Sequence, residues 1–180
     1  MHAYRTATVS EEEFLALPET TEKVELLDGE VIMAPAPSVL HQDVLGTLVY
    51  ALRTWARAQP TPVFVGQSPL DVRFGPERIL QPDALLILGR VDTRRKGPID
   101  RVPEIVVEVL SPTDRVYDRV TKRLVYAEAG VVEYWLVHLA GFIERWSGPS
   151  LERNEVPLER VTSPLLPGFD LDVRTIFPPE

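Results

Sequence analysis

The apolar positions of the chain form two kinds of pattern, continuous runs and periodic runs. Residues 105–110 (IVVEVL) and 84–88 (ALLIL) are almost continuously aliphatic, which is typical of strands buried on both faces of a sheet. Residues 70–74 (LDVRF) alternate between apolar and polar positions, which indicates a strand with one buried face. In residues 38–58 apolar positions recur at helical spacing, and this predicts a long helix with one apolar face.

Turn and capping residues mark the ends of further elements. Ser10 and Glu13 have capping-box spacing, which predicts a short N-terminal helix. An Asp-Gly pair between two apolar runs predicts a hairpin over residues 24–33, and a glycine after residues 117–129 suits a helix that ends there. Further strands are predicted at residues 62–65, 132–137 and 142–146, with two or three short strands after residue 151. This order predicts an α+β, or mixed α/β, fold with helices packed on a central sheet.

Composition limits the classes of protein. With 180 residues, of which 44% are hydrophobic, the chain is expected to form one domain over residues 1–180 with a sizeable core. It has no cysteine, which excludes disulfides, thiolate zinc sites and cysteine nucleophiles. No run approaches the roughly 20 apolar residues of a membrane span, and the N-terminus lacks the pattern of a signal peptide. We therefore predict a cytoplasmic protein without membrane contact.

The charge distribution bears on nucleic acid as a partner. The net charge of −8 counts against a broad nucleic-acid-binding face. Residues 90–123, however, hold nine of the 19 basic residues and six of the 27 acidic ones. This positive region surrounds Glu108 in the sequence, which keeps a nucleic-acid partner open. Alternatively, the basic residues of the loop at about 89–102 are a solvated loop tip.

Each of the two continuous apolar runs carries one carboxylate. Glu108 lies inside residues 105–110, and Asp83 follows Pro82 directly before residues 84–88. An unpaired carboxylate is costly to bury, so two acids entering a sheet core from different strands need a cation. We hypothesise a divalent metal ion, Mg²⁺ or Mn²⁺, because hard cations bind through one or two carboxylates together with substrate phosphate. Such a site is suited to phosphodiester hydrolysis.

An ordered set of motifs resembles the bacterial putative restriction endonuclease family, a branch of the PD-(D/E)XK nuclease superfamily. The set comprises ELLDGE at residues 25–30, His41, Pro82-Asp83, the Glu108 strand with Ser111-Pro112, Asp118, Lys122, Tyr126, Gly130 and Glu133-Tyr134-Trp135. The resemblance covers about residues 8–146. It implies a restriction-endonuclease-like core, a central mixed sheet flanked by helices, and a Mg²⁺- or Mn²⁺-dependent endonuclease acting on DNA. Since cleavage of a duplex needs two sites, we also expect a homodimer or a higher homo-oligomer.

Carried over residue by residue, the resemblance assigns Asp83 and Glu108 as metal ligands. The superfamily has a lysine two residues after the glutamate, where this chain has Leu110. The resemblance to this branch assigns that role to Lys122 on the following helix, where an ammonium group would polarise the attacking water. Further possible site residues are Glu25, as an additional oxygen ligand, His41 and Tyr126.

The candidates also have purely structural interpretations. Glu108 could pair with Arg101 or Arg119, and Lys122 could form a surface pair with Asp118 worth about 0.2–0.5 kcal/mol. Asp83 could cap a turn, and Glu25 could be a solvent-facing hairpin residue. His41 could be a hydrogen-bonded helix residue. These interpretations would leave the chain without a catalytic site.

Two other functions remain compatible with the same scaffold. A catalytically inactive nucleic-acid- or protein-binding module is favoured by Leu110 at the motif position and by the acidic total. A hydrolase of small phosphoesters is the third possibility. Measuring metal binding distinguishes an enzyme from the binding module. Activity on DNA or on a small phosphoester then distinguishes the nuclease from the phosphoester hydrolase.

Overall fold

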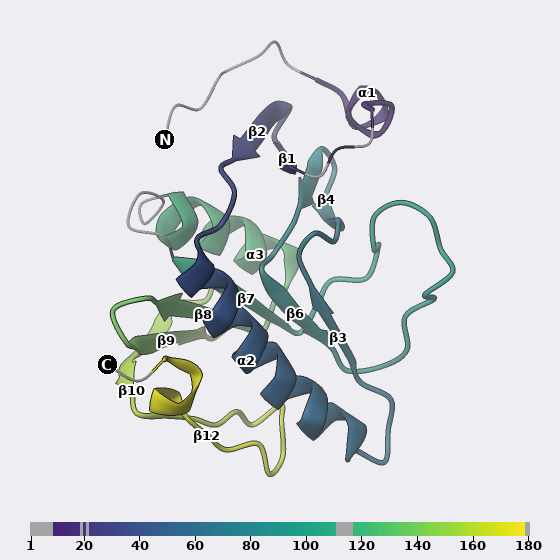
Figure 1. Cartoon of the computed structure of the whole chain (residues 1–180). Coiled ribbons are helices and arrows are strands. Elements are labelled where there is room, and N and C mark those ends of the chain that lie inside the picture. The colour runs from purple at the N-terminus through teal and green to yellow at the C-terminus, as the bar shows by residue number, and fades with distance from the viewer. Residues whose placement is uncertain (1–8, 19, 21, 111–116, 179–180) are drawn as a thin grey trace.

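The computed structural model describes residues 9–18, 20, 22–110 and 117–178 (Figure 1). The elements in chain order are α1 (Glu11–Leu15), β1 (Lys23–Leu27), β2 (Glu30–Ala34), α2 (Val39–Arg57), β3 (Phe64–Gln67), β4 (Val72–Gly75), β5 (Arg78–Leu80), β6 (Ala84–Ile87), β7 (Ile105–Leu110), the π-helix η1 (Tyr117–Lys122), α3 (Arg123–Ala129), β8 (Glu133–His138), β9 (Phe142–Ser147), β10 (Arg153–Leu158), β11 (Arg160–Val161), β12 (Leu171–Asp172) and the 3₁₀-helix η2 (Val173–Ile176). Within the described ranges, no helix has both the length and the hydropathy needed to cross a bilayer.

A six-stranded mixed sheet forms the centre of the fold, with strand order β10-β9-β8-β7-β6-β3. Strand β7 runs parallel to β8 and antiparallel to β6. Every residue of β7 is buried, as its continuous apolar run predicted. The mixed sheet with flanking helices confirms the predicted fold class.

A smaller sheet with order β2-β1-β5-β4 packs beside the first. Its β1–β2 hairpin turns at Asp28 and Gly29, whose φ angles of 50° and 80° are both positive. Two positive φ angles fit a type I′ turn, for which Asp-Gly is a preferred pair. The hairpin predicted from these two residues is therefore confirmed.

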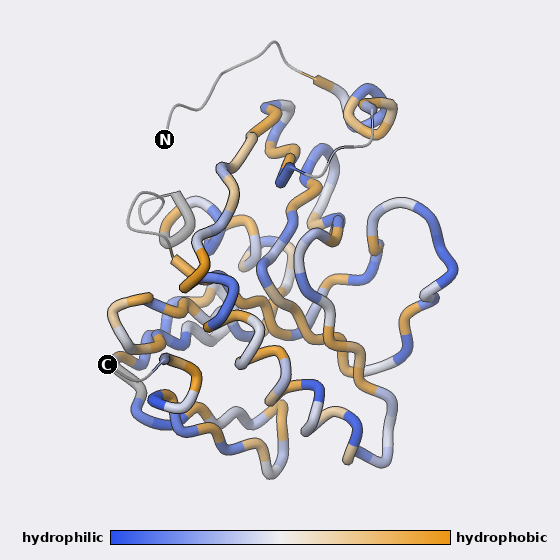
Figure 2. Tube along the Cα trace, in the orientation of Figure 1, coloured by the Kyte–Doolittle hydropathy of each residue, from blue (hydrophilic) through white to orange (hydrophobic). Residues whose placement is uncertain are grey.

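The two faces of the six-stranded sheet are covered by different elements (Figures 1 and 2). On one face, apolar residues of α2 and of the C-terminal segment pack against the sheet in a single cluster. On the other face, α3 and parts of the smaller sheet form a second cluster. The smaller sheet and α3 therefore lie on the same side of β7, which is the side that carries the candidate site.

The predicted helices are confirmed with one correction. Ser10 and Glu13 form the capping box of α1, and the side chain of Ser38 caps α2. The helix predicted over residues 117–129 is π-helical in η1 and α-helical only in α3, because apolar spacing does not distinguish a locally wider turn. Ser111 and Pro112 of the motif set lie outside the described residues.

The strand predictions are confirmed in position, with one strand missed. The missed strand is β5, which ends at Leu80 in the smaller sheet, whereas the predicted apolar run forms β6 of the larger sheet from Ala84 on. The chain crosses from one sheet to the other at residues 81–83, so Asp83 lies where the two sheets meet. The C-terminal segment contains the short strands β10, β11 and β12, as expected.

Candidate functional site

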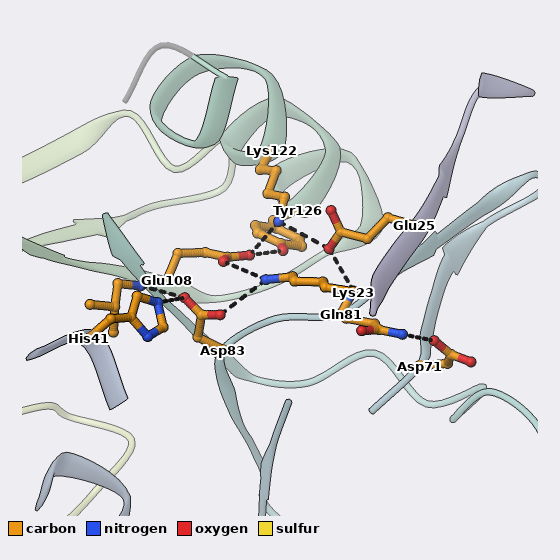
Figure 3. A network of polar contacts seen from close by, with 10 residues as sticks. Lys23, Glu25, His41, Asp71, Gln81, Asp83, Glu108, Lys122 and Tyr126 are labelled. Carbon is orange, nitrogen blue, oxygen red and sulfur yellow. Dashed lines mark hydrogen bonds and ion pairs between the residues drawn. The ribbon is translucent and has the colours of Figure 1, made fainter. Parts of the chain in front are cut away.

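Charged side chains gather where the two sheets and the η1–α3 helix meet (Figure 3). They come from five segments that are separate in the sequence: β1, the start of α2, the crossing at residues 81–83, β7, and η1–α3. The side chains are Lys23, Glu25, His41, Asp83, Glu108, Lys122 and Tyr126. Six of these seven were candidates from the sequence, and Lys23 was not.

Asp83 accepts hydrogen bonds from three different elements. Lys23 Nζ lies 3.0 Å from Oδ1, and the backbone N–H of Val109 donates to Oδ2 at 2.8 Å. His41 Nε2 lies 3.2 Å from Oδ2, and because an ionised carboxylate only accepts, this ring nitrogen is the donor. The interpretation of His41 as a hydrogen-bonded helix residue is therefore confirmed, and its partner is the carboxylate itself.

Glu108 is bound at both of its carboxylate oxygens. Lys122 Nζ and Tyr126 Oη donate to Oε1 at 3.0 Å and 2.6 Å. Lys23 Nζ lies 3.7 Å from Oε2. The alternative that Glu108 pairs with Arg101 is wrong, since Arg101 pairs with Glu104 instead, and the side chain of Arg119 lies outside what the structure describes.

Glu25 and Lys122 are both buried, which contradicts their surface interpretations. The side chain of Glu25 is 3% exposed and that of Lys122 is 2% exposed. Glu25 Oε1 accepts hydrogen bonds from Lys122 Nζ at 3.1 Å and from the backbone N–H of Gln81 at 2.8 Å. Lys122 therefore bridges Glu25 and Glu108, and the predicted solvent-facing role of Glu25 is wrong because β1 turns this side chain toward β5 and η1.

Local periodicity explains how these side chains come to share one site. Alternate residues of a strand point to the same face, so Lys23 and Glu25 of β1 both face the cluster. Residues four apart on a helix share one face, which places Lys122 and Tyr126 side by side on Glu108. The period of two in β1 was the signal by which Lys23 could have been found once Glu25 was a candidate.

The surroundings shift the pKa values of the two acids in opposite directions. Burial raises the pKa of Asp83, but Lys23, His41 and the Val109 N–H together outweigh burial and hold this pKa below its usual value. For Glu108 burial prevails, and its pKa is raised although Lys122 and Lys23 oppose the shift. Asp83 is therefore the more firmly ionised of the two carboxyl groups.

The ammonium group of Lys23 is held as a cation in spite of its burial. Burial and the neighbouring Lys122 lower the pKa of Lys23, but Glu108, Asp83 and Glu25 more than compensate and raise it above its usual value. Tyr126 is held in its neutral form, because burial and the charge of Glu108 raise its pKa well above the usual value. The phenol is thus a hydrogen-bond donor to Glu108.

The donor set suits a hard divalent cation. Asp83 Oδ1 and Glu108 Oε2 converge on one positively charged atom, Lys23 Nζ, so two oxygens from neighbouring strands already surround a cation. Within the described ranges, no group of three or more histidine and carboxylate side chains is arranged to hold a metal ion alone. Two carboxylates completed by water and phosphate are sufficient for magnesium, so these residues fit such an ion if Lys23 withdraws.

The basic region around Glu108 in the sequence is divided in space. Because β6 and β7 are antiparallel, with Leu86 opposite Ile105, the loop of residues 88–104 lies at the end of the strand pair away from Asp83 and Glu108 (Figure 1). Within this loop, Arg95 forms an ion pair with Asp100. The positive charge of this loop is therefore not at the candidate site, although the loop is close to Glu108 in the sequence.

Comparison with known proteins places the fold. A family model described as Uma2, Putative restriction endonuclease, matches residues 11–174. Among solved structures, the chain is similar to the crystal structure of a putative nuclease belonging to DUF820 from Anabaena variabilis ATCC 29413, with 22% identity and a TM-score of 0.77 over 94% of this chain and 97% of that chain. None of the curated proteins matches the chain. The structural likeness confirms the restriction-endonuclease-like core predicted from the sequence.

Proposed function

The chain belongs to the Uma2 family, described as Putative restriction endonuclease, and from this premise we propose that it is a metal-dependent endonuclease hydrolysing phosphodiester bonds in DNA. The observation that carries the proposal is the convergence of Asp83 Oδ1 and Glu108 Oε2 on one cationic atom. Both side chains are buried, with Glu108 in β7 and Asp83 directly before the neighbouring strand β6. A rigid pair of this kind is what a hydrolytic metal site requires.

Each residue of the site has a defined task in this proposal. Asp83 and Glu108 would bind Mg²⁺ or Mn²⁺, and such an ion supplies Lewis-acid chemistry by polarising phosphate and activating water. His41 and the Val109 N–H orient Asp83, while Tyr126 orients Glu108. These contacts fix both carboxylates before substrate arrives, which lowers the reorganisation needed for the reaction.

Lys122 takes the role that the superfamily gives to a lysine at the position of Leu110. Its ammonium group contacts Glu108 Oε1 at 3.0 Å, so it lies beside one metal ligand and can stabilise negative charge that develops there. Glu25 accepts a hydrogen bond from the same ammonium group. Glu25 is thus a positioning residue for Lys122, and a further oxygen donor next to the pair.

The family supports DNA as the proposed substrate, and the two strands of a duplex are the reason for proposing a dimer. A single site cuts one strand at a time, so cleavage of both strands of DNA calls for two copies in a symmetric dimer. Light scattering of the purified protein, with and without a DNA duplex, measures this assembly. A monomer in both conditions would limit the proposal to single-strand nicking.

The decisive experiment is nicking of supercoiled plasmid DNA in the presence of Mg²⁺ or Mn²⁺. We expect nicking by the wild type, none with a chelator, and none in Asp83→Asn or Glu108→Gln, which keep size but remove charge. Glu12→Gln is the matched control, because Glu12 is exposed on α1 and should retain full activity. Equal nicking by wild type and both site variants would refute the assignment.

A non-catalytic module remains the second candidate, favoured by one specific observation. Leu110 stands at the motif position of the lysine, and its side chain is buried in an apolar cluster. If the wild type binds Mn²⁺ and DNA but does not nick the plasmid, this second function replaces the first. A chromogenic phosphodiester, offered in parallel, tests hydrolysis of small substrates.

A further inference from the structure

Lys23 occupies the point at which the proposed metal ligands converge. Its ammonium nitrogen lies 3.0 Å from Asp83 Oδ1 and 3.7 Å from Glu108 Oε2. The side chain arrives from β1 of the smaller sheet, whereas Glu108 belongs to β7 of the larger sheet (Figure 3). One positive charge therefore already fills the gap that the proposed function gives to a divalent cation.

The charge balance of the site changes with the occupant of this gap. Three carboxylates face the ammonium groups of Lys23 and Lys122, so with a neutral imidazole the cluster carries one excess negative charge. Adding a divalent ion beside Lys23 would make the cluster positive and set two cations against the same oxygens. Exchanging Lys23 for a divalent ion leaves the cluster neutral, and this is electrostatically the better arrangement.

The two lysines differ in their freedom to move. The side chain of Lys23 is 20% exposed, whereas that of Lys122 is 2% exposed. Lys23 is the first residue of β1, and its four-carbon stem is flexible. It can therefore withdraw toward solvent, but Lys122 cannot leave without breaking two buried ion pairs.

We infer that Lys23 is an exchangeable internal counter-ion, which holds Asp83 and Glu108 together in the metal-free protein and leaves the gap when a divalent cation binds. This inference rests on the proposed function, since it requires the two carboxylates to bind metal. It adds that the ammonium group of Lys23 competes with the metal ion for the same two carboxylates. The metal affinity of the wild type is then lower than the two carboxylates alone would give, because only the fraction with Lys23 withdrawn can bind.

The first test uses the unmodified protein, which has three lysines, Lys23, Lys96 and Lys122. Lysines are acetylated in the absence and presence of saturating Mn²⁺, and the rate at each one is measured by mass spectrometry. We expect Mn²⁺ to accelerate modification of Lys23 several-fold, with the exposed Lys96 unchanged as internal reference. An unchanged or slower rate at Lys23 overturns the inference.

The second test is calorimetric titration of Lys23→Met with Mn²⁺, beside the wild type and Lys96→Met. Methionine keeps the length of the side chain without its charge, and we expect it to bind Mn²⁺ about tenfold more tightly or better. Lys96→Met should bind as the wild type does. If Lys23→Met does not fold, the acetylation of the wild type decides.

The outcomes of the titration separate the two proposals. Equal or weaker binding by Lys23→Met, when the wild type does bind, overturns the counter-ion and leaves the proposed function standing. Absence of Mn²⁺ binding by both proteins overturns the proposed metal site, and the counter-ion with it.

Discussion

Replacing Lys122 with methionine tests whether the buried cluster is held together by charge. The ammonium group of Lys122 lies 3.0 Å from Glu108 and 3.1 Å from Glu25, and all three side chains are at most 3% exposed. Removing one partner of a buried ion pair costs about 3–5 kcal/mol, because the other charge is left without compensation. Because the remaining carboxylates are buried, solvent cannot screen their charge, and we expect a loss of about 3–5 kcal/mol in the free energy of unfolding.

The assay is thermal and urea unfolding followed by circular dichroism. For a chain of this size, 1 kcal/mol shifts the unfolding temperature by about 2–4 °C, so Lys122→Met should lower it by about 6–20 °C. Lys96→Met is the matched control, since Lys96 is exposed in the loop of residues 88–104. This control should change the free energy of unfolding by less than about 0.5 kcal/mol.

A second substitution identifies electrostatics as the cause. In the Lys122→Met background, Glu25→Gln removes one of the uncompensated charges and should recover part of the lost free energy of unfolding. Additional destabilisation by Glu25→Gln would instead indicate lost packing or hydrogen bonding. The reasoning is refuted if Lys122→Met unfolds at the same temperature as Lys96→Met.

Three further predictions concern a hydrogen bond of the site, the β1–β2 turn and the loop at the far end of β6 and β7. Tyr126→Phe removes the hydrogen bond to Glu108 but keeps the buried ring, and should lower the free energy of unfolding by about 1.5–3 kcal/mol; an unchanged urea midpoint would contradict this. Gly29→Ala forces alanine into the left-handed region and should cost about 1–2 kcal/mol in the same assay, whereas no loss would argue against the observed turn. Arg94→Gln with Lys96→Gln should leave plasmid nicking within about twofold of the wild type, because the loop lies at the far end of β6 and β7; a tenfold loss would place this loop at the DNA.

The two acids could be predicted because each lies within or directly beside a continuous apolar run, where a buried strand would otherwise carry apolar residues. Glu108 lies within a strand whose residues are all buried, and Asp83 directly precedes another such strand, β6. From the sequence, the two strands can be expected to be neighbours, but their register cannot be predicted. The structure adds that Ala84 lies opposite Val107, which brings the two carboxylates to the same end.

The period of two in β1 puts Lys23 on the same face as Glu25, but what this face covers depends on how the two sheets pack. The crossing of the chain at residues 81–83 places β1 of the smaller sheet over the end of β7, and no periodicity in either segment encodes that placement. The same limit explains Glu25, whose solvent exposure was predicted wrongly. A hairpin residue is exposed or buried according to what covers the hairpin, and here β5 and η1 cover it.

The packing around Leu110 explains why an ammonium group reaches Glu108 from the layer that covers the sheet and not from β7 itself. Leu110 is two residues after Glu108 and therefore points to the same face of β7, where it packs in the apolar cluster with Val125 of α3. A lysine at this position would have to bring its ammonium group through that cluster. Instead, the η1–α3 helix packed on this face places the ammonium group of Lys122 3.0 Å from Glu108 Oε1. In the proposed function this ammonium group takes the place of a strand lysine, because what the proposal requires is a cation beside Glu108 and not a particular element to carry it.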